Sequence, residues 1–170
     1  MFFKTISVMK SRPIAALVGF VMTPLTVFAG EITGVPRIHD GDTVKIGQTK
    51  LRLSGMDAPE TDQICLNADG QKWACGIAAR DALIKYSNGQ IWECTTTGDG
   101  GYKRSLAKCF IEGEDVSAWM VRSGWALSYV RYSHDYDAAE TAARNIGAGL
   151  WSARLLRRGT GSTGTGRRLF

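Results

Sequence analysis

From residue 31 to residue 55, hydrophobic and polar residues alternate with a period of two, which predicts short β-strands. The apolar members of the two clearest runs are Val44, Ile46, Leu51 and Leu53. Gly47-Gln48 separates the runs and is typical of a turn. Because successive side chains on a strand point to opposite faces, we expect Arg52 to face away from the buried side.

The middle of the chain predicts one helix followed by two further strands. Trp73, Ile77 and Ile84 recur at helical spacing, and Gly89 follows as a stop signal. Residues 91–97 and 105–111 have strand composition, and residues 98–101 between them form a glycine-rich turn.

Two more helices and a short strand are predicted in the last third. Asp115 has the place of an N-cap for residues 116–121, which end before Gly124, and residues 125–130 read as a strand. The final helix, over residues 135–146, places on one side Tyr136, Ala139, Ala143 and Ile146. Strands interrupted by helices in this order predict an α+β protein with a small closed barrel of five strands, rather than a parallel sheet.

Residues 1–29 are typical of a secretory signal peptide. Lys4, Lys10 and Arg12 precede an apolar run that ends in Val27-Phe28-Ala29, so the mature chain is expected to begin at Gly30. The alternative is an uncleaved anchor, but the run is at the short limit for spanning a bilayer. We therefore expect an exported protein, secreted or periplasmic, with no stable membrane insertion after cleavage.

The charge of the chain is unevenly distributed. Of the formal +5, three positive charges lie in residues 1–29 and five arginines lie in residues 154–170, a flexible arginine- and glycine-rich tail. Residues 30–153, the predicted folded domain, keep 13 basic and 16 acidic residues. The basic tail is expected to add a weak, salt-sensitive attraction to phosphates or the envelope.

Four cysteines in an exported chain indicate two disulfides. Three pairings exist; Cys94 and Cys109 lie in the two predicted neighbouring strands, which favours a bridge between them and leaves Cys65 with Cys75. A four-cysteine zinc site is the alternative, but the chain has no C-x-x-C pair.

Residues with candidate chemistry cluster in residues 39–43 and 51–61. Asp42, Asp57 and Glu60 would repel one another near Arg52 unless a cation intervened, and their hard oxygen atoms suit Ca²⁺ or Mg²⁺. A second basic element follows at Arg104, beside the glycine-rich turn. Two arginines, a metal and a carboxylate are the groups needed for attack on a phosphodiester.

These motifs resemble the staphylococcal-nuclease-like (thermonuclease) family over residues 32–151. The matching pieces, in order, are Asp40-Gly41-Asp42-Thr43-Val44, Arg52-Leu53, Asp57-Ala58-Pro59-Glu60-Thr61, residues 102–107, residues 115–124 and Gly149-Leu150-Trp151. The resemblance implies an OB-fold, a five-stranded β-barrel with three α-helices. It also implies Ca²⁺-dependent cleavage of DNA and RNA that leaves 3′-phosphates.

The resemblance also implies a role for each matching residue. The expected calcium ligands are Asp42, Asp57 and the carbonyl of Ala58, with Asp40 in the outer shell. The expected catalytic residues are Arg52, Arg104 and Glu60, the last of which handles the attacking water. Tyr102 is expected to hydrogen-bond a terminal phosphate, and Tyr129 to pack on a nucleotide, with Tyr132 as its rival.

The chain departs from the family pattern at the turn before Arg104. Lys103 stands where the family commonly has glycine, Gly101 stands where it can have a phosphate-contacting lysine, and Asp99 lies one residue further away. If the glycine position needs a positive φ, Lys103 costs about 1 kcal/mol.

Three functions remain open on the sequence alone. The first is a monomeric Ca²⁺-dependent nuclease acting on DNA and RNA, preferably single-stranded. The second is a non-catalytic OB-fold binder of single strands, and the third is a nuclease-fold protein of an envelope pathway such as exopolysaccharide production. His39 and His134 are expected to have surface or packing roles.

Overall fold

A computed structural model describes residues 30–67 and 69–152; the predicted signal peptide and arginine-rich tail therefore lie outside the described residues. Within the described part, no helix is both long and apolar enough to cross a membrane.

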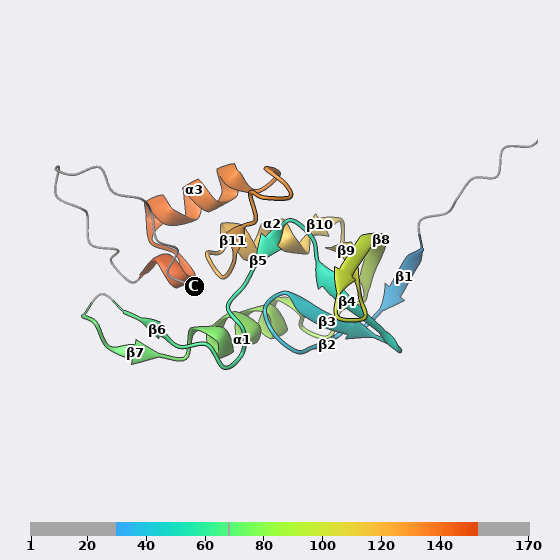
Figure 1. Cartoon of the computed structure of the whole chain (residues 1–170), viewed down its shortest axis with the longest axis horizontal. Helices are drawn as coiled ribbons and strands as arrows, with labels where there is room; N and C mark the ends of the chain where they lie inside the picture. Colours follow the sequence, from blue (N-terminus) through green and yellow to red (C-terminus); the bar gives the residue numbers. More distant parts are fainter. Residues whose placement is uncertain (1–29, 68, 153–170) are drawn as a thin grey trace, which may run out of the picture.

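Most strands belong to one mixed sheet, seen at the right of Figure 1. Its strands are β1 (Glu31–Gly34), β2 (Arg37–Ile38), β3 (Thr43–Ile46), β4 (Thr49–Leu53), β8 (Trp92–Gly101), β9 (Arg104–Ile111) and β10 (Glu114–Asp115). They are ordered β1-β8-β9-β4-β3-β2, with β10 also paired to β9. The β4–β9 pair is parallel and the others are antiparallel.

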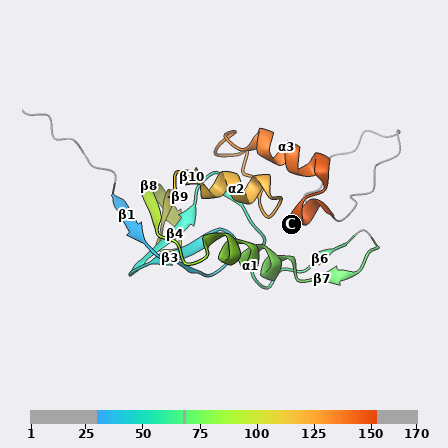
Figure 2. The same cartoon turned by 180° about the vertical axis from the view of Figure 1, so that it is seen from behind.

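The remaining elements lie outside this sheet. They are β5 (Met56–Asp57), β6 (Cys65–Leu66), β7 (Lys72–Trp73), α1 (Cys75–Ser87), α2 (Val116–Arg122), β11 (Leu127–Ser128), α3 (Asp137–Ile146) and a 3₁₀ turn, η1 (Gly149–Ser152). Strand β5 pairs with β11, and β6 with β7. Seen from behind in Figure 2, α2 lies between α3 and the sheet, and the β6–β7 hairpin extends beyond the start of α1.

The prediction of an α+β fold with three helices is confirmed. The sheet curls so that its ends approach each other: a Cβ placed on Gly34, at the end of β1, would lie 2.9 Å from the Ile46 side chain at the end of β3. Hydrogen-bonded closure of the barrel is nevertheless not detected in the described residues, because no ladder joins β1 to β2 or β3 there.

The core lies between the sheet and the helices. Its largest fully buried side chains include Trp92, Leu51, Leu53, Met56, Leu83 and Met120. Leu51 and Leu53 are buried on the inner face of β4, as their alternation predicts. This strand therefore has a fixed outer face, on which Arg52 lies.

The buried face of α1 differs from the predicted one. Ile77 and Ile84 are 41% and 47% exposed, whereas the helix buries Gly76, Ala79 and Leu83. Small residues at the interface let the helix approach its neighbours closely, and this contact, rather than the largest apolar side chains, sets its orientation.

The other two helices agree better with their sequence signals. The Asp115 carboxylate accepts hydrogen bonds from the backbone N–H groups of Ser117 and Ala118, so the predicted N-cap of α2 is confirmed. Helix α3 begins at Asp137, two residues later than predicted, and Ile146 is 79% exposed, so it does not share the predicted buried face.

Two disulfides form in the predicted pairing, Cys65–Cys75 and Cys94–Cys109. Cys94 and Cys109 are directly opposite each other in the β8–β9 ladder. The Cys65–Cys75 bridge joins β6 to the first residue of α1. Two disulfides indicate a location outside the cytoplasm.

Candidate active site

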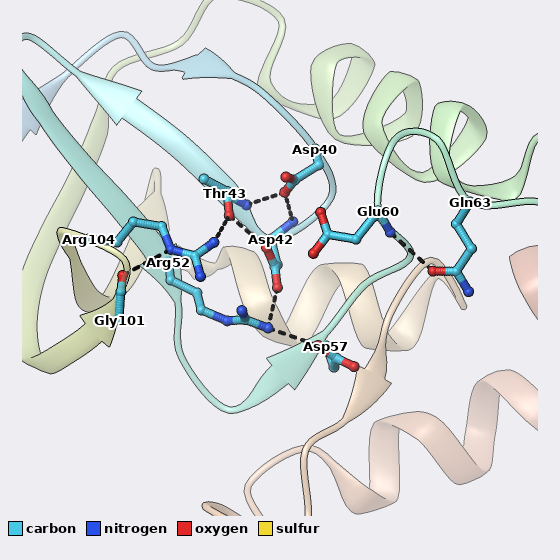
Figure 3. Close-up of polar contacts among 9 residues, drawn as sticks. All are labelled: Asp40, Asp42, Thr43, Arg52, Asp57, Glu60, Gln63, Gly101 and Arg104. Atoms are coloured by element: carbon cyan, nitrogen blue, oxygen red, sulfur yellow. Dashed lines mark hydrogen bonds and ion pairs between the residues drawn. The ribbon is translucent and has the colours of Figure 1, made fainter. Parts of the chain in front are cut away.

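The acidic turn before β3 is held by hydrogen bonds from its backbone to the side chain of Asp40. One carboxylate oxygen of Asp40 accepts hydrogen bonds from the N–H groups of Asp42 (3.1 Å) and Thr43 (2.7 Å), as Figure 3 shows. Gly41 is buried, and a Cβ there would lie 2.6 Å from the Cβ of Ala58. The turn is thus packed against the segment that follows β5, which brings two of the predicted motifs together.

Arg52 lies between two carboxylates on the outer face of β4. Its Nη2 is 2.7 Å from Oδ2 of Asp42 and 2.9 Å from Oδ1 of Asp57 (Figure 3). The parity of the strand predicted this direction, and the structure confirms it. One guanidinium is therefore shared by two of the three acids whose mutual repulsion was expected from the sequence.

Arg104, the first residue of β9, also reaches the acidic turn. Its Nη1 donates to Oγ1 of Thr43 at 3.0 Å, and its Nε donates to the carbonyl of Gly101 at 3.3 Å (Figure 3). Thr43 in turn donates to Oδ1 of Asp42 at 2.8 Å. A continuous polar chain therefore joins Arg104, Thr43, Asp42 and Arg52.

The turn that presents Arg104 is strained. Tyr102 and Lys103 join Gly101 to its ladder partner Arg104, with φ of 49° and 61°. A two-residue hairpin turn with both φ values positive favours glycine or asparagine, so Tyr102 and Lys103 cost about 1 kcal/mol or more each. The expected positive φ at Lys103 is present, and Arg104 still reaches Thr43.

Glu60 lies in the loop after β5, and its backbone is hydrogen-bonded to Gln63 of the same loop. Its N–H donates to Oε1 of Gln63 at 3.3 Å, and its carbonyl accepts from the N–H of Gln63 at 2.8 Å. Partial burial, followed by the nearby charge of Asp40, raises the pKa of Glu60, while Arg52 and Arg104 act in the opposite direction. A carboxylate with a raised pKa is a stronger proton acceptor than an ordinary glutamate.

A hollow of about 400 Å³ opens beside these groups. It is lined by His39, Thr43, Lys50, Glu60, Tyr102 and Arg104. The fold thus brings together three predicted site residues from distant segments, Glu60, Tyr102 and Arg104. Tyr102 is 92% exposed, and the Arg104 guanidinium lies 5.7 Å from the centre of its ring.

The sequence analysis missed two residues of this hollow. His39 was expected to have a surface or packing role, although its position next to Asp40 could have placed it here. Lys50 was assigned no role, although it lies two residues before Arg52 and thus on the same face of β4.

Tyr129 does not line the hollow. It is half-buried, its N–H donates to the carbonyl of Gly55 at 2.9 Å, and its ring packs edge-on against Tyr132. Tyr132, its rival from the sequence, is 71% exposed.

The residues predicted to bind a metal can be tested against the structure. Burial raises the pKa of Asp42 to about 7, with Arg52 opposing the shift. Its buried Oδ2 accepts no well-directed hydrogen bond, although the Arg52 guanidinium is beside it. Oδ2 of Asp42 and Oδ1 of Asp57 both contact Nη2 of Arg52, and two carboxylate oxygens that converge in this way suit a hard cation. Among the described residues no group of three or more His, Cys, Asp or Glu could hold a metal ion, so the ligand set of Asp42, Asp57 and the Ala58 carbonyl stays a prediction.

Two arginines, a partly buried glutamate and a pair of carboxylates thus lie around the acidic turn, and groups of these kinds can stabilise the charge on a phosphodiester under attack. A family model described as "Staphylococcal nuclease homologue" matches residues 50–153, and the chain belongs to this family. The matched span includes Arg52, Asp57, Glu60 and Arg104, and it begins after Asp42.

Curated relatives carry two kinds of name. The succinoglycan biosynthesis protein ExoI of Rhizobium meliloti is 33% identical over 143 residues, covering 82% of this chain and 75% of ExoI. An uncharacterized endonuclease of Haemophilus influenzae is 33% identical over 125 residues, covering 69% of this chain and 65% of the relative. The endonuclease YhcR of Bacillus subtilis is 30% identical over 141 residues, which are 72% of this chain and 12% of YhcR.

Proposed function

We propose that the protein is an exported, monomeric, Ca²⁺-dependent nuclease that hydrolyses DNA and RNA, preferably single-stranded, and leaves 3′-phosphates. The observation that carries this proposal is the convergence of Glu60, Arg52 and Arg104 around the acidic turn, with Arg104 and Glu60 lining the same hollow. Family membership and the endonuclease names of several relatives support it. The two disulfides support export, and the curled sheet supports a five-stranded OB-fold barrel.

The division of labour follows from where each group lies. Glu60, with its raised pKa, accepts the proton of the water that attacks phosphorus. Arg104 and Arg52 donate hydrogen bonds to phosphate oxygens and stabilise the negative charge that grows on them in the transition state. Tyr102, exposed at the rim of the hollow, hydrogen-bonds a terminal phosphate. Tyr129, outside the hollow, packs against a nucleotide further along the chain.

Asp42, Asp57 and the carbonyl of Ala58 are the groups that would hold Ca²⁺. When bound, the ion would polarise a phosphate oxygen and stabilise the negative charge of the transition state. The acidic turn then has a second purpose: Asp40 fixes the backbone of Asp42 and Thr43, so the ligand carboxylate is held before any ion arrives.

The test is cleavage of denatured DNA by purified full-length protein, with Ca²⁺ or with a chelator. We expect Ca²⁺-dependent products whose 3′ ends become extendable only after phosphatase treatment. Arg52→Ala and Arg104→Ala should each lower kcat by about 10²-fold or more, because each removes a donor to the transition state. Arg80→Ala is the matched control, since Arg80 pairs with Asp81 on α1, outside the hollow. An absence of Ca²⁺-dependent cleavage would refute the proposal, and near-normal turnover in either arginine variant would remove that residue from the mechanism.

The similarity to ExoI over most of the chain favours a second candidate, a role in the biosynthesis of an exopolysaccharide. Complementation of a strain that lacks the gene separates the two. If the role depends on hydrolysis, wild-type protein restores polysaccharide and Arg104→Ala does not; if it is structural, both restore it.

A further inference from the structure

A row of unneutralised cations crosses the outer face of the sheet beside the proposed active site. Arg37 on β2 is directly opposite Lys45 on β3, and Lys45 is directly opposite Lys50 on β4. These strands lie side by side in Figure 1. Their inward positions, Val44, Ile46 and Leu51, are in the core, so the three cations share the outer face.

This arrangement is unfavourable for the fold alone. Cβ atoms of directly opposed residues lie about 4.5–5.5 Å apart, and like charges in such pairs are destabilising. In the described part of the chain, no carboxylate lies within 4.0 Å of Arg37, Lys45 or Lys50; the ammonium of Lys45 donates only to the amide oxygen of Gln48, at 3.1 Å. Residues 30–153 carry more acidic than basic residues, so the row is not part of a generally basic surface.

The row leads into the hollow. Lys50 itself lines the hollow together with Arg104 and Glu60. Strand β4 runs parallel to β9, with Leu51 opposite Ser105. Lys50 precedes Leu51 and Arg104 precedes Ser105, so Lys50 and Arg104 are neighbours at the start of this pair of strands. Across β2, β3 and β4 the row spans two inter-strand distances, about 10 Å, which is the length of two or three stacked nucleotides at about 3.4 Å each.

We propose that Arg37, Lys45 and Lys50 form a binding track for the phosphates of a stacked single nucleic-acid strand, adjacent to the phosphate that is cleaved. This inference rests on the nucleic-acid substrate of the proposed function and adds a site outside the predicted catalytic and metal-binding residues. The track contacts phosphates and no base edges, so it raises affinity without regard to base sequence. A single strand suits the track because it continues into the hollow, where unpaired bases can stack on the exposed ring of Tyr102 beside Arg104.

The experiment measures binding of fluorescent oligothymidylate 12-mer to the full chain, in a chelator so that no cleavage occurs. The track variant is Arg37→Gln/Lys45→Gln/Lys50→Gln. Each lost phosphate contact on a single strand lowers the slope of log affinity against log salt by about 0.7, so three contacts lower it by about 2. Between 50 and 200 mM NaCl the wild type should therefore lose about 16-fold more affinity than the track variant. A mixed-sequence 12-mer should show the same difference.

The control variant removes three charges elsewhere, Lys72→Gln/Arg80→Gln/Lys85→Gln on β7 and α1. It should keep the wild-type salt slope, and Lys45→Arg/Lys50→Arg should keep it too. A track variant with the same salt slope as the control would overturn the proposal, because these three positions would then contribute no more to binding than three charges elsewhere. A slope change seen with polygalacturonate but not with the 12-mer would also overturn it, in favour of an acidic polysaccharide. Cleavage of DNA in Ca²⁺ is measured separately, so failure of the nuclease proposal is recognised independently of the track.

Discussion

Gly76, the second residue of α1, gives the sharpest test of how the proposed catalytic glutamate is positioned. A Cβ placed on Gly76 would lie 1.7 Å from the carbonyl oxygen of Glu60 and 3.0 Å from Cα of Thr61. Real Cβ atoms essentially never approach closer than 3.0 Å, so Gly76→Ala must displace the Glu60 backbone or the helix by about 1.3 Å or more. A misplacement of about 1 Å in a catalytic group can lower turnover by about 10²-fold.

The effect on stability is expected to be smaller than the effect on activity. Replacing a helical glycine by alanine favours the helix by about 1 kcal/mol, whereas overpacking costs about 1–3 kcal/mol. We therefore expect Gly76→Ala to stay folded, with kcat on single-stranded DNA about 10²-fold lower and KM changed less.

The assay is steady-state cleavage in Ca²⁺ together with a thermal melt followed by circular dichroism. Gly98→Ala is the matched control, since Gly98 lies in β8 with no atom within 4 Å of an added Cβ and without a positive φ. If Gly76→Ala turns over within twofold of wild type while remaining folded, the contact does not position Glu60.

Two other predictions use the disulfides and the buried acid. By chain entropy, removing Cys65–Cys75 (separation 10) or Cys94–Cys109 (separation 15) by paired serine substitution costs about 2.7 and 3.0 kcal/mol, so both should lower the melting temperature similarly. Only loss of Cys65–Cys75, which anchors the loop after Glu60 to α1, should lower kcat at temperatures where both variants are folded; equal kcat values would contradict this. For Asp42, the folded pKa of about 7 is above the ordinary 3.8, so between these pH values the folded state holds a proton that the unfolded chain has released. Without Ca²⁺, stability should therefore fall as pH rises through this window, by up to about 1.4 kcal/mol per pH unit, and urea unfolding of Asp42→Asn should lack that slope.

Local patterns were sufficient for β3, β4 and the direction of Arg52. They were wrong for β8, which continues through the predicted turn at residues 98–101, so that the turn falls at Tyr102 and Lys103. Alternation of Leu51, Arg52 and Leu53 determines which face each side chain takes, and the Asp115 N-cap depends on only three neighbouring residues. The face of α1 was not predictable in this way. Its contacts are made through Gly76 and Ala79 against segments distant in sequence, and a hydrophobicity pattern gives such small residues little weight.

In the candidate site, too, contacts between segments far apart in the sequence were harder to predict than local ones. The hydrogen bond from Arg104 to Thr43 joins residues 61 positions apart, and nothing in the sequence predicted it, although Arg104 was expected in the site. The shape of the hollow, and therefore the inclusion of His39 and Lys50, depends on the packing of four segments. The positive φ of Lys103 was expected from the glycine it replaces, but its neighbour Tyr102 shares the strain, because both central positions of this hairpin turn are left-handed.

The parallel pairing of β4 with β9 has a consequence for when the protein becomes active. Arg52 and Arg104 come into one site only after residues as late as Ala107 have joined the ladder beside β4. A chain that is still being synthesised or threaded across a membrane has therefore emerged with Asp42, Asp57 and Glu60 long before it can hold the second arginine against them. In the exported nuclease proposed above, the unfinished chain therefore lacks one of the two arginines that hydrolysis needs.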